Sequence, residues 1–369
     1  MTIKPARRKT IVNEIIALTK ELIRYKSVHT KTEEIRRCAD FIENFLRAHQ
    51  LSYLRKEFNG FPSILAAPQT GYAPVLLMSH IDVVDGPDAI FEPRIEGEML
   101  FGRGSIDDKY AAALSLVLLK NRVSELRREG KKEEDAGIAV LITGDEEVGG
   151  HNGVKQMLNH IRCDFCITLD GGSVRKIIIK EKGLFTLKLI SRGKASHGSR
   201  PWMGENAIEV LMDDYLKLKP FFKDKTEDHW HRTMSLNVIR AGNSFNQVPD
   251  YAEAVFDIRY TEKDDMDALF GEMQKAVKGE LSLLRREPLF FSEDSPFLRM
   301  LQEVSPESRL TYEHGASDAR FLSEFAIPGV VWGADGDQSA HSADEHVNIP
   351  SIQALYERID ACIRRIKKT

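Results

Sequence analysis

The sequence predicts an α/β protein in which an open α/β sheet domain is interrupted by an inserted α+β domain. Strand patterns alternate with helix patterns through residues 74–170 and resume after the insertion, an order typical of α/β sheets. Between them, residues 178–292 follow the order β-α-β-β-α-β, which is that of a ferredoxin-like antiparallel sheet with helices on one face. We therefore expect a discontinuous first domain over 1–177 and 293–369.

Composition narrows the class of protein further. Of the 369 residues, 42% are hydrophobic and 29% are charged, which is too apolar for a disordered chain. A net charge of −4 gives no basic footprint for nucleic acid. No apolar run approaches the roughly 18 residues that span a bilayer, the N-terminus lacks the apolar core of a secretion signal, and four cysteines make no disulfide framework. We expect a soluble, cytoplasmic protein with neither nucleic acid nor a membrane as partner.

The first domain is expected to open with two amphipathic helices, because apolar side chains recur at helical spacing over residues 11–22 and 35–45. A long helix over Asp108–Arg128 is apolar through its first half, which predicts burial. The remaining elements expected before the insertion are the strands Tyr53–Phe58, Ser63–Ala67, Pro74–Ser79, Ile138–Thr143 and Asp164–Leu169, and the helix Gly153–His160.

The insertion begins where residues 177–192 start to alternate between apolar and polar, as one strand would. Its other expected elements are the helices Ala207–Leu218 and Asp265–Val277 and the strands Met234–Arg240, Glu253–Tyr260 and Leu283–Phe291. The first domain then resumes with the helices Phe297–Val304, Asp318–Phe325 and Ser351–Lys367 and the strands Arg309–Glu313 and Gly329–Trp332.

Side chains that bind metals stand where strands of the first domain end. They are His80, Asp107, the pair Glu146-Glu147, and Asp170, together with His341 in a late polar loop. Ligands of open α/β sheets bind beyond the carboxyl ends of the strands, so we expect these side chains to meet there. Two histidines and three carboxylates, one of them from the glutamate pair, suit zinc, cobalt or manganese. A carboxylate shared by two ions would make a two-metal hydrolytic site.

Neighbouring residues in these motifs can take different roles. Adjacent residues of an extended segment face opposite ways, so one glutamate of the pair Glu146-Glu147 can bind metal while the other acts as a base. His80 and Asp82, two residues apart, share a face, so the Asp82 carboxylate can orient the imidazole. Each motif alone has an ordinary interpretation as a surface group, a turn or a helix cap. Their common position at strand ends favours a site.

Six motifs occur together along essentially the whole chain: SHIDVV at 79–84, GRGSIDDK at 102–109, TGDEEVGG at 143–150, LDGG at 169–172, ASHGSRPWMGENAI at 195–208 and AHSADEHVNI at 340–349. With these motifs the sequence resembles the di-zinc amidohydrolase and exopeptidase family that includes acetylornithine deacetylase, succinyl-diaminopimelate desuccinylase, aminoacylase and glutamate carboxypeptidase. The resemblance implies a zinc-exopeptidase-like α/β catalytic domain with an inserted ferredoxin-like dimerisation domain.

The resemblance implies two zinc ions per subunit, with cobalt or manganese as alternatives. His80 and Asp170 would bind one ion, Glu147 and His341 the other, and Asp107 would bridge both.

The same resemblance gives two further residues of the site their roles. Asp82 would orient His80, and Glu146 would be the general base that activates the hydroxide bridging the metals and then protonates the leaving amine. The peptide between Asp107 and Asp108 is expected to be cis.

Substrate-binding residues are also implied by the resemblance. His197 would reach across a homodimer interface to stabilise the oxyanion of the partner's site. Arg259 would grip a substrate carboxylate, although a salt-bridged strand residue is an equally good interpretation. Asn246 would contact the substrate, and the segment holding Gly315 and Ser317 would bind its carboxylate end through backbone N–H groups.

The expected activity is hydrolysis of an amide bond in an N-acyl amino acid or a small peptide that bears a free carboxylate. A deacylase and a dipeptidase or carboxypeptidase remain alternatives, and a catalytically silent ligand-binding scaffold is an alternative of a different class. Three departures from the family pattern are expected to lie near the substrate: Tyr110, His314 and the loop 333–338.

Overall fold

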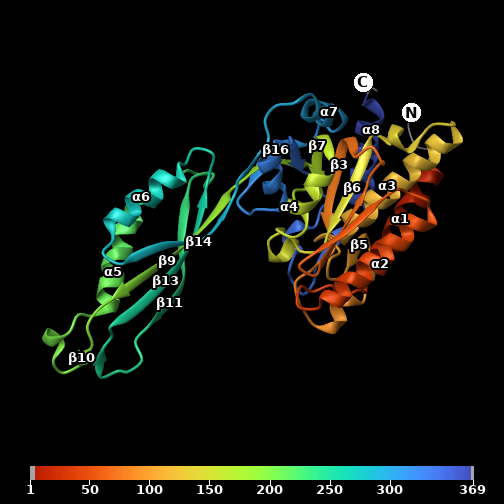
Figure 1. Cartoon of the computed structure of the whole chain (residues 1–369). Helices are drawn as coiled ribbons and strands as arrows, with labels where there is room; N and C mark the ends of the chain where they lie inside the picture. The colour runs from red at the N-terminus through yellow and green to blue at the C-terminus, as the bar shows by residue number, and fades with distance from the viewer. Residues whose placement is uncertain (1–4, 367–369) are drawn as a thin grey trace. The chain divides into compact units, whose positions relative to one another are not determined.

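The computed structural model describes residues 5–366 and divides the chain into two compact units. The first unit comprises Met1–Lys180, Ser292–Glu313 and Ser317–Thr369, and the second comprises Glu181–Phe291 and His314–Ala316. Each unit has its own sheet and its own helices (Figure 1).

The unit boundary differs from the predicted one because residues 177–192 form two strands. The first, β8 (Lys176–Glu181), pairs with β17 (Gly329–Val331), where Ile178 lies opposite Val331. The second, β9 (Gly183–Arg192), belongs to the other sheet. Residues 178–180 therefore stay with the first unit, since their backbone hydrogen bonds complete its sheet.

The sheet of the first unit runs in the order β1-β2-β6-β3-β7-β17-β8, and β16 also pairs with β8. The other strands are β1 (Leu54–Phe58), β2 (Phe61–Ala66), β3 (Tyr72–His80), β6 (Ile138–Thr143), β7 (Arg162–Thr168) and β16 (Arg309–Glu313). The central strands are parallel: β3 pairs in this sense with β6 and β7, and β7 with β17. The carboxyl ends of β3, β6 and β7 therefore lie at one edge of the sheet.

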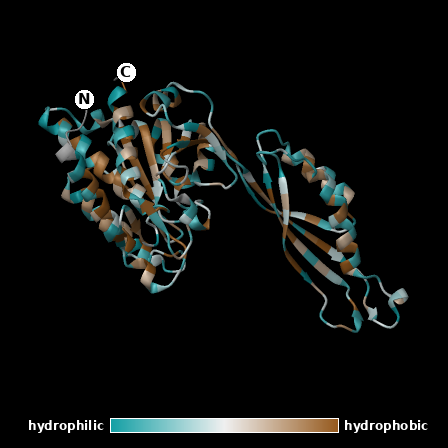
Figure 2. Ribbon diagram, turned by 180° about the vertical axis from the view of Figure 1, so that it is seen from behind, coloured by the Kyte–Doolittle hydropathy of each residue, from teal (hydrophilic) through white to brown (hydrophobic). Residues whose placement is uncertain are grey.

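Helices bury this sheet, which explains the unbroken apolar runs of its central strands. Every residue of β6 is buried, and brown, hydrophobic segments lie along the central strands (Figure 2). The helices are α1 (Pro5–Ile23), α2 (Thr32–Ala48), α3 (Lys109–Arg128), α4 (Val154–Met157), α7 (Pro296–Val304) and α8 (Ile349–Arg365). The first half of α3 is buried throughout, as its composition predicted, and α3 packs against α1 and α8.

Three predicted helices differ in extent or kind. Gly153–His160 is α4 followed by a 3₁₀ turn, Leu158–His160, and Asp318–Phe325 is a 3₁₀ helix, η7. The last helix ends at Arg365, and Lys367 lies outside the described residues. A small antiparallel sheet, β4 (Arg94–Glu96), β5 (Met99–Phe101) and β18 (His346–Asn348), completes the first unit.

The second unit has the predicted ferredoxin-like arrangement. Its antiparallel sheet has the order β11-β13-β9-β14, and α5 (Ala207–Leu218) and α6 (Met266–Ala276) pack on it. The further strands are β11 (Thr233–Ala241), β13 (Tyr251–Tyr260) and β14 (Glu280–Glu287). Along β9, buried residues alternate with half-buried ones, because one face of the sheet packs on the helices.

Short strands complete the second unit. Strands β10 (Ser196–His197) and β12 (Gln247–Val248) pair with each other, and the chain leaves the unit through β15 (Phe290–Phe291). Among the residues that the structure describes, no helix combines the length and apolar character needed to cross a membrane.

Candidate metal centre

Parallel strands bring the predicted ligands to one edge of the first sheet. His80 is the last residue of β3, the pair Glu146-Glu147 follows β6 by three residues, and Asp170 follows β7 by two. Asp107 reaches the same place from the turn that leads into α3.

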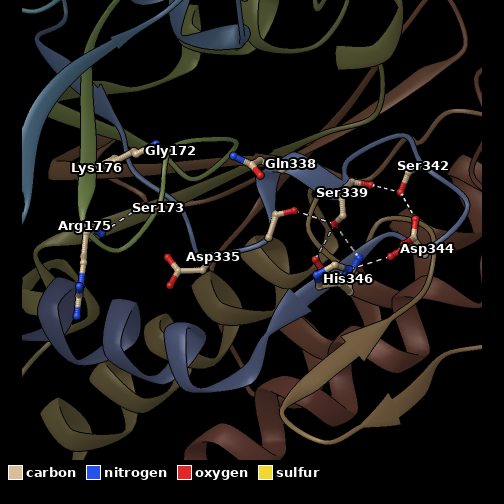
Figure 3. A pocket seen from close by; sticks show the side chains of 11 residues that line it. Gly172, Ser173, Arg175, Lys176, Asp335, Gln338, Ser339, Ser342, Asp344 and His346 are labelled. Carbon is tan, nitrogen blue, oxygen red and sulfur yellow. Dashed lines mark hydrogen bonds between the residues drawn. The ribbon is translucent and has the colours of Figure 1, made fainter.

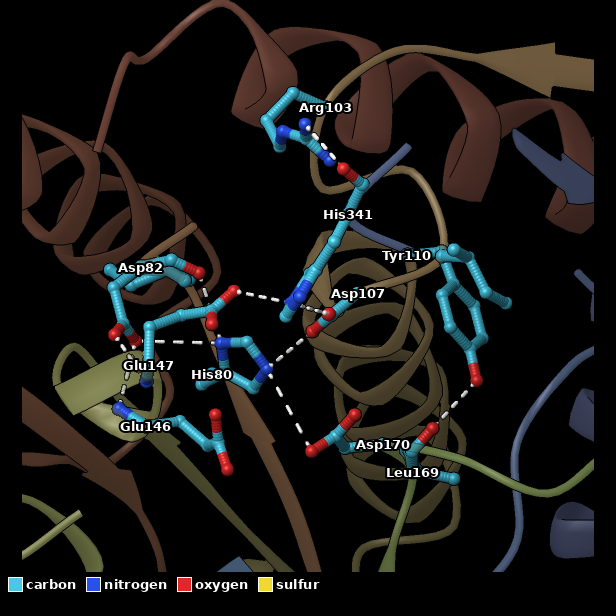
Figure 4. A network of polar contacts seen from close by, with 12 residues as sticks. His80, Asp82, Arg103, Asp107, Tyr110, Glu146, Glu147, Leu169, Asp170 and His341 are labelled. Atoms are coloured by element: carbon cyan, nitrogen blue, oxygen red, sulfur yellow. Dashed lines mark hydrogen bonds and ion pairs between the residues drawn. The ribbon is translucent and has the colours of Figure 1, made fainter. Parts of the chain in front are cut away.

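The donor atoms form two groups that meet at Asp107 (Figure 4). One group is His80, Glu146 and Asp170, and the other is Asp107, Glu147 and His341, with the donor atoms of each group within 4.8 Å of one another. The two Asp107 oxygens face different histidines: Oδ1 lies 2.9 Å from His80 Nε2, and Oδ2 lies 2.9 Å from His341 Nε2. Asp107 therefore has the geometry of a shared ligand.

His80 presents one nitrogen to this cluster and uses the other for orientation. Its Nδ1 donates to the backbone oxygen of Asp82 over 3.0 Å and lies 3.4 Å from the Asp82 carboxylate. A donor at Nδ1 leaves Nε2 with the lone pair that a metal ligand needs.

Asp82 also holds the glutamate pair. Its two carboxylate oxygens accept from the backbone N–H groups of Glu146 at 3.1 Å and Glu147 at 2.9 Å, and its side chain is fully buried. The end of β3 is thereby fixed to the loop after β6. Sequence reasoning gave Asp82 only the role toward His80, since a bond to a backbone group 64 residues away leaves no local pattern.

The pKa values of the cluster follow from its crowding. Burial lowers the pKa of His80, but the Asp107 and Asp82 side chains outweigh it and raise the pKa well above its usual range. The Asp107 and Glu147 side chains raise the pKa of His341 to about 10. Burial, followed by the nearby Asp318 carboxylate, raises the pKa of Glu146 well above that of a free glutamate. The cluster thus retains protons unless another cation balances its carboxylates.

The donor set fits a pair of divalent metal ions. Two buried atoms, His80 Nε2 and Glu147 Oε1, make no hydrogen bond of good geometry within the described part of the chain. An ion bound between them is one explanation for buried polar atoms left in this way. Imidazole nitrogens mixed with carboxylate oxygens suit zinc, cobalt and manganese. The peptide between Asp107 and Asp108 is cis, as the resemblance implied.

Comparison with known proteins identifies the family. A model described as Peptidase family M20/M25/M40 matches residues 76–365. The chain belongs to this family. It is therefore a metal-dependent hydrolase of the M20 group, whose members act on amide bonds of peptides or acyl amino acids, and the family resemblance and fold class read from the sequence are confirmed.

Curated relatives match over nearly the whole chain. A succinyl-diaminopimelate desuccinylase of Wolbachia pipientis is 28% identical over 92% of this chain and 90% of its own length. A LysW-lysine/LysW-ornithine hydrolase of Sulfurisphaera tokodaii is 25% identical over 90% of each chain.

Solved structures share the M20 fold. Aminopeptidase PepT of Bacillus cereus superposes with a TM-score of 0.77 at 19% identity, over 95% of this chain and 98% of that one. A dinuclear metal-binding M20 peptidase of Bacillus subtilis superposes with a TM-score of 0.65 at 14% identity, over 96% and 98%.

His197 and Asn246, two of the predicted substrate residues, are neighbours in the second unit. Strand β10 pairs His197 with Gln247, and the N–H of Gly198 donates to the Asn246 carbonyl over 2.6 Å. The His197 Nδ1 atom lies 2.8 Å from the Ser199 hydroxyl. The candidate metal ligands, in contrast, all belong to the first unit.

The other predicted substrate residues have partners of their own. Arg259 forms a two-bonded ion pair with Asp257, with distances of 2.8 and 3.1 Å. The Ser317 hydroxyl accepts from the N–H of Ala319 and caps η7. Space is open around the Gly315 α-carbon. The salt-bridged interpretation of Arg259 is thus realised here, and its use in substrate binding stays a prediction.

Tyr110 is buried rather than exposed at an open surface, and its expected place near the substrate stays a prediction. Its side chain is 0% exposed, and its hydroxyl donates to the carbonyl of Leu169 and accepts from the N–H of Ala334, each over 2.8 Å. Tyr110 therefore joins α3 to the segments after β7 and β17 inside the core.

The other two departures from the family pattern have different surroundings. His314 is exposed, with its ring 6.1 Å from that of Trp230 in the second unit. The loop 333–338 contributes Asp335, Gly336 and Gln338 to a polar pocket of about 640 Å³ in the first unit (Figure 3).

Sequence reasoning also missed Arg320, a buried arginine beside the glutamate pair. Its guanidinium donates to the carbonyls of Ser317 at 2.7 Å and Gly149 at 2.8 Å, and lies 4.0 Å from a Glu146 carboxylate oxygen. It thereby ties the loop carrying Glu146 to the segment that opens η7. The only sequence signal was an arginine within the stretch GASDARF.

Proposed function

We propose that this protein hydrolyses an amide bond in an N-acyl amino acid or small peptide that carries a free carboxylate, with the help of two divalent metal ions. The observation that carries the proposal is the pair of donor groups that meet at Asp107, whose two oxygens face His80 and His341 at 2.9 Å.

Five residues would hold the ions. His80 and Asp170 would bind one, Glu147 and His341 the other, and Asp107 both. When bound, such ions polarise a carbonyl and lower the pKa of water. Zinc is our first choice, with cobalt and manganese as alternatives, because the ligands mix nitrogen and oxygen.

Glu146 would move the proton. Its carboxylate lies within reach of the first ion's ligands and is not needed as a ligand once Asp107 is shared. It takes a proton from the attacking water and delivers it to the amine that leaves, which is the work of a general base and then a general acid. Asp82 fixes its backbone through the N–H of Glu146.

Four further residues would bind the substrate. Arg259 could bind the free carboxylate if Asp257 yields its place, Asn246 would contact the substrate, and the segment with Gly315 and Ser317 offers backbone N–H groups. The named relatives include a desuccinylase, and the solved neighbours include an aminopeptidase, so both acyl amino acids and peptides are candidate substrates.

We further infer a homodimer in which the second unit, as a dimerisation domain, presents His197 to the partner's metal centre. His197 lies beside Asn246 on a short strand pair of that unit, far in sequence from every metal-binding residue. A histidine there could donate a hydrogen bond to the oxyanion of the transition state.

The test is metal removal followed by reconstitution. Protein stripped of metal by a chelator should lack activity. On reloading with zinc, cobalt or manganese it should bind two ions per chain and hydrolyse members of a panel of N-acyl amino acids and dipeptides. Full activity without metal, or a fully loaded protein that cleaves no member of the panel, contradicts the proposal.

A further inference from the structure

A buried ion pair lies behind the metal-binding residues and is not part of the proposed chemistry. Arg103 Nη1 lies 2.5 Å from Glu345 Oε2, and the two side chains are only 4% and 2% exposed. Burying two charges carries a desolvation cost that their attraction alone often fails to recover. Stability alone therefore does not explain a pair buried in this way, and the backbone groups that it contacts indicate a further role.

Glu345 holds the backbone of the shared ligand. Its second oxygen, Oε1, accepts from the N–H groups of Ile106 and Asp107, each over 3.3 Å. Its own carbonyl accepts from the N–H of Gly102 over 3.0 Å. Glu345 thus fastens the turn that delivers Asp107.

Arg103 holds the backbone of a second ligand. Its Nη2 donates to the carbonyl of His341 over 3.3 Å (Figure 4), while Nη1 stays on Glu345. One ion pair therefore connects the main chain of Asp107 with that of His341, although 233 or more residues separate the two segments.

The two metal positions depend on this pair to different degrees. His80 and Asp170 extend from the ends of the buried strands β3 and β7, which hold them independently. His341, in contrast, lies in a loop, its side chain is 54% exposed, and its backbone has a φ of 63°, which an L-residue rarely adopts without support. The hydrogen bond from Arg103 fixes the main chain at His341.

We propose that Arg103 and Glu345 are positioning residues that set chiefly the affinity of the metal position formed by Asp107, Glu147 and His341. The position of His80 and Asp170 shares only Asp107 with it and depends on the pair less. The inference rests on the proposed metal centre. Loss of an outer partner of a metal ligand typically costs about 10–100-fold in metal affinity.

The experiment is a stepwise titration of the metal-free protein with zinc by calorimetry and with cobalt by visible absorption. Wild type is compared with Glu345→Gln, Arg103→Lys and the control Asp360→Asn. Asp360 is also a buried carboxylate paired with an arginine, Arg364, at 2.7 Å, but on α8. We expect one binding step to weaken about 10–100-fold in the first two variants. The other step, which shares only Asp107, should weaken clearly less, and Asp360→Asn should match wild type.

Equal weakening of both steps, no weakening, or the same loss in Asp360→Asn would overturn the inference. If Glu345→Gln does not fold, Arg103→Lys decides alone. It keeps the positive charge but replaces the two nitrogens that contact Glu345 and the His341 carbonyl by a single one on a shorter side chain. A wild-type protein that binds fewer than two ions would instead count against the proposed function, so the two failures are distinguishable.

Discussion

At the scale of single residues, the centre depends on Asp82, a fully buried carboxylate between His80 and the glutamate pair. Replacing it by alanine leaves the N–H groups of Glu146 and Glu147 without their acceptor. Because these bonds place a ligand and the base, we expect Asp82→Ala to lose about 10–100-fold in metal affinity and most of its turnover. Elemental analysis after dialysis against a weak chelator measures the first effect.

The matched control is Ser79→Ala on the same strand, whose buried hydroxyl makes no hydrogen bond among the described residues. It should keep wild-type metal content. Wild-type metal retention in Asp82→Ala would refute the role given to this carboxylate.

A second prediction at this scale concerns acid stability. Lys188 and Tyr251 bond to the Glu253 carboxylate and lower its pKa from the ordinary 4.5 to about 2. A pKa that is lower in the folded state stabilises the fold above the unfolded value, and this stabilisation disappears as the pH falls from 4.5 toward 2. At pH 7, wild type should therefore unfold at a higher midpoint urea concentration than Glu253→Gln. The difference between the two midpoints should disappear on acidification. A gap that widens in acid would contradict this account.

The sequence was sufficient to predict which candidate ligands the fold brings together and insufficient for the bonds that hold them. The meeting of His80, Asp107 and Asp170 could be predicted because each follows a recognisable strand or turn motif. The pairing of Arg103 with Glu345 could not, because 242 residues separate the partners and neither stands in a periodic pattern. The proximity of such groups is a product of the tertiary fold.

At the scale of elements, apolar runs and alternation predicted most of the longer strands, including β6 with its observed bounds, but not short ones such as β4, β10 and β18. They failed at residues 177–192, where two strands of different sheets follow each other across Lys182. Alternation continues through such a junction, since both strands pack one face on a core. The pattern therefore could not locate the passage from one unit to the other.

The element-scale prediction concerns Tyr110, which connects α3 to the ends of two strands. Tyr110→Phe leaves the buried Leu169 carbonyl and Ala334 N–H without this partner, so we expect a loss of about 1–3 kcal/mol in the free energy of unfolding. Urea unfolding monitored by circular dichroism measures it.

The control for this variant is Tyr72→Phe, whose exposed hydroxyl bonds to Asp164. It should cost no more than about 0.5 kcal/mol, as is usual at a surface position. Equal losses in the two variants would show that the buried hydroxyl has no special role.

At the scale of the whole molecule, the proposed assembly makes each metal centre incomplete without a second subunit. His197 belongs to the second unit and the proposed metal ligands to the first. If His197 acts in the partner's site, a dimer of one Glu146→Gln subunit and one His197→Ala subunit contains one intact site. Unfolding and refolding an equal mixture should restore about a quarter of wild-type activity, since half of the dimers are mixed and each has one intact site. Two inactive variants that stay inactive after mixing would refute the shared site.

The central claim is that Glu146 moves the proton at a two-metal centre without being needed to hold the metals. The most direct measurement is turnover and metal content of Glu146→Gln in the same sample, beside wild type. We predict two ions per chain, as in wild type, and turnover reduced by about 10²–10⁴-fold, the usual contribution of a general acid–base group. Wild-type turnover in this variant, or loss of the metals along with activity, would contradict the claim.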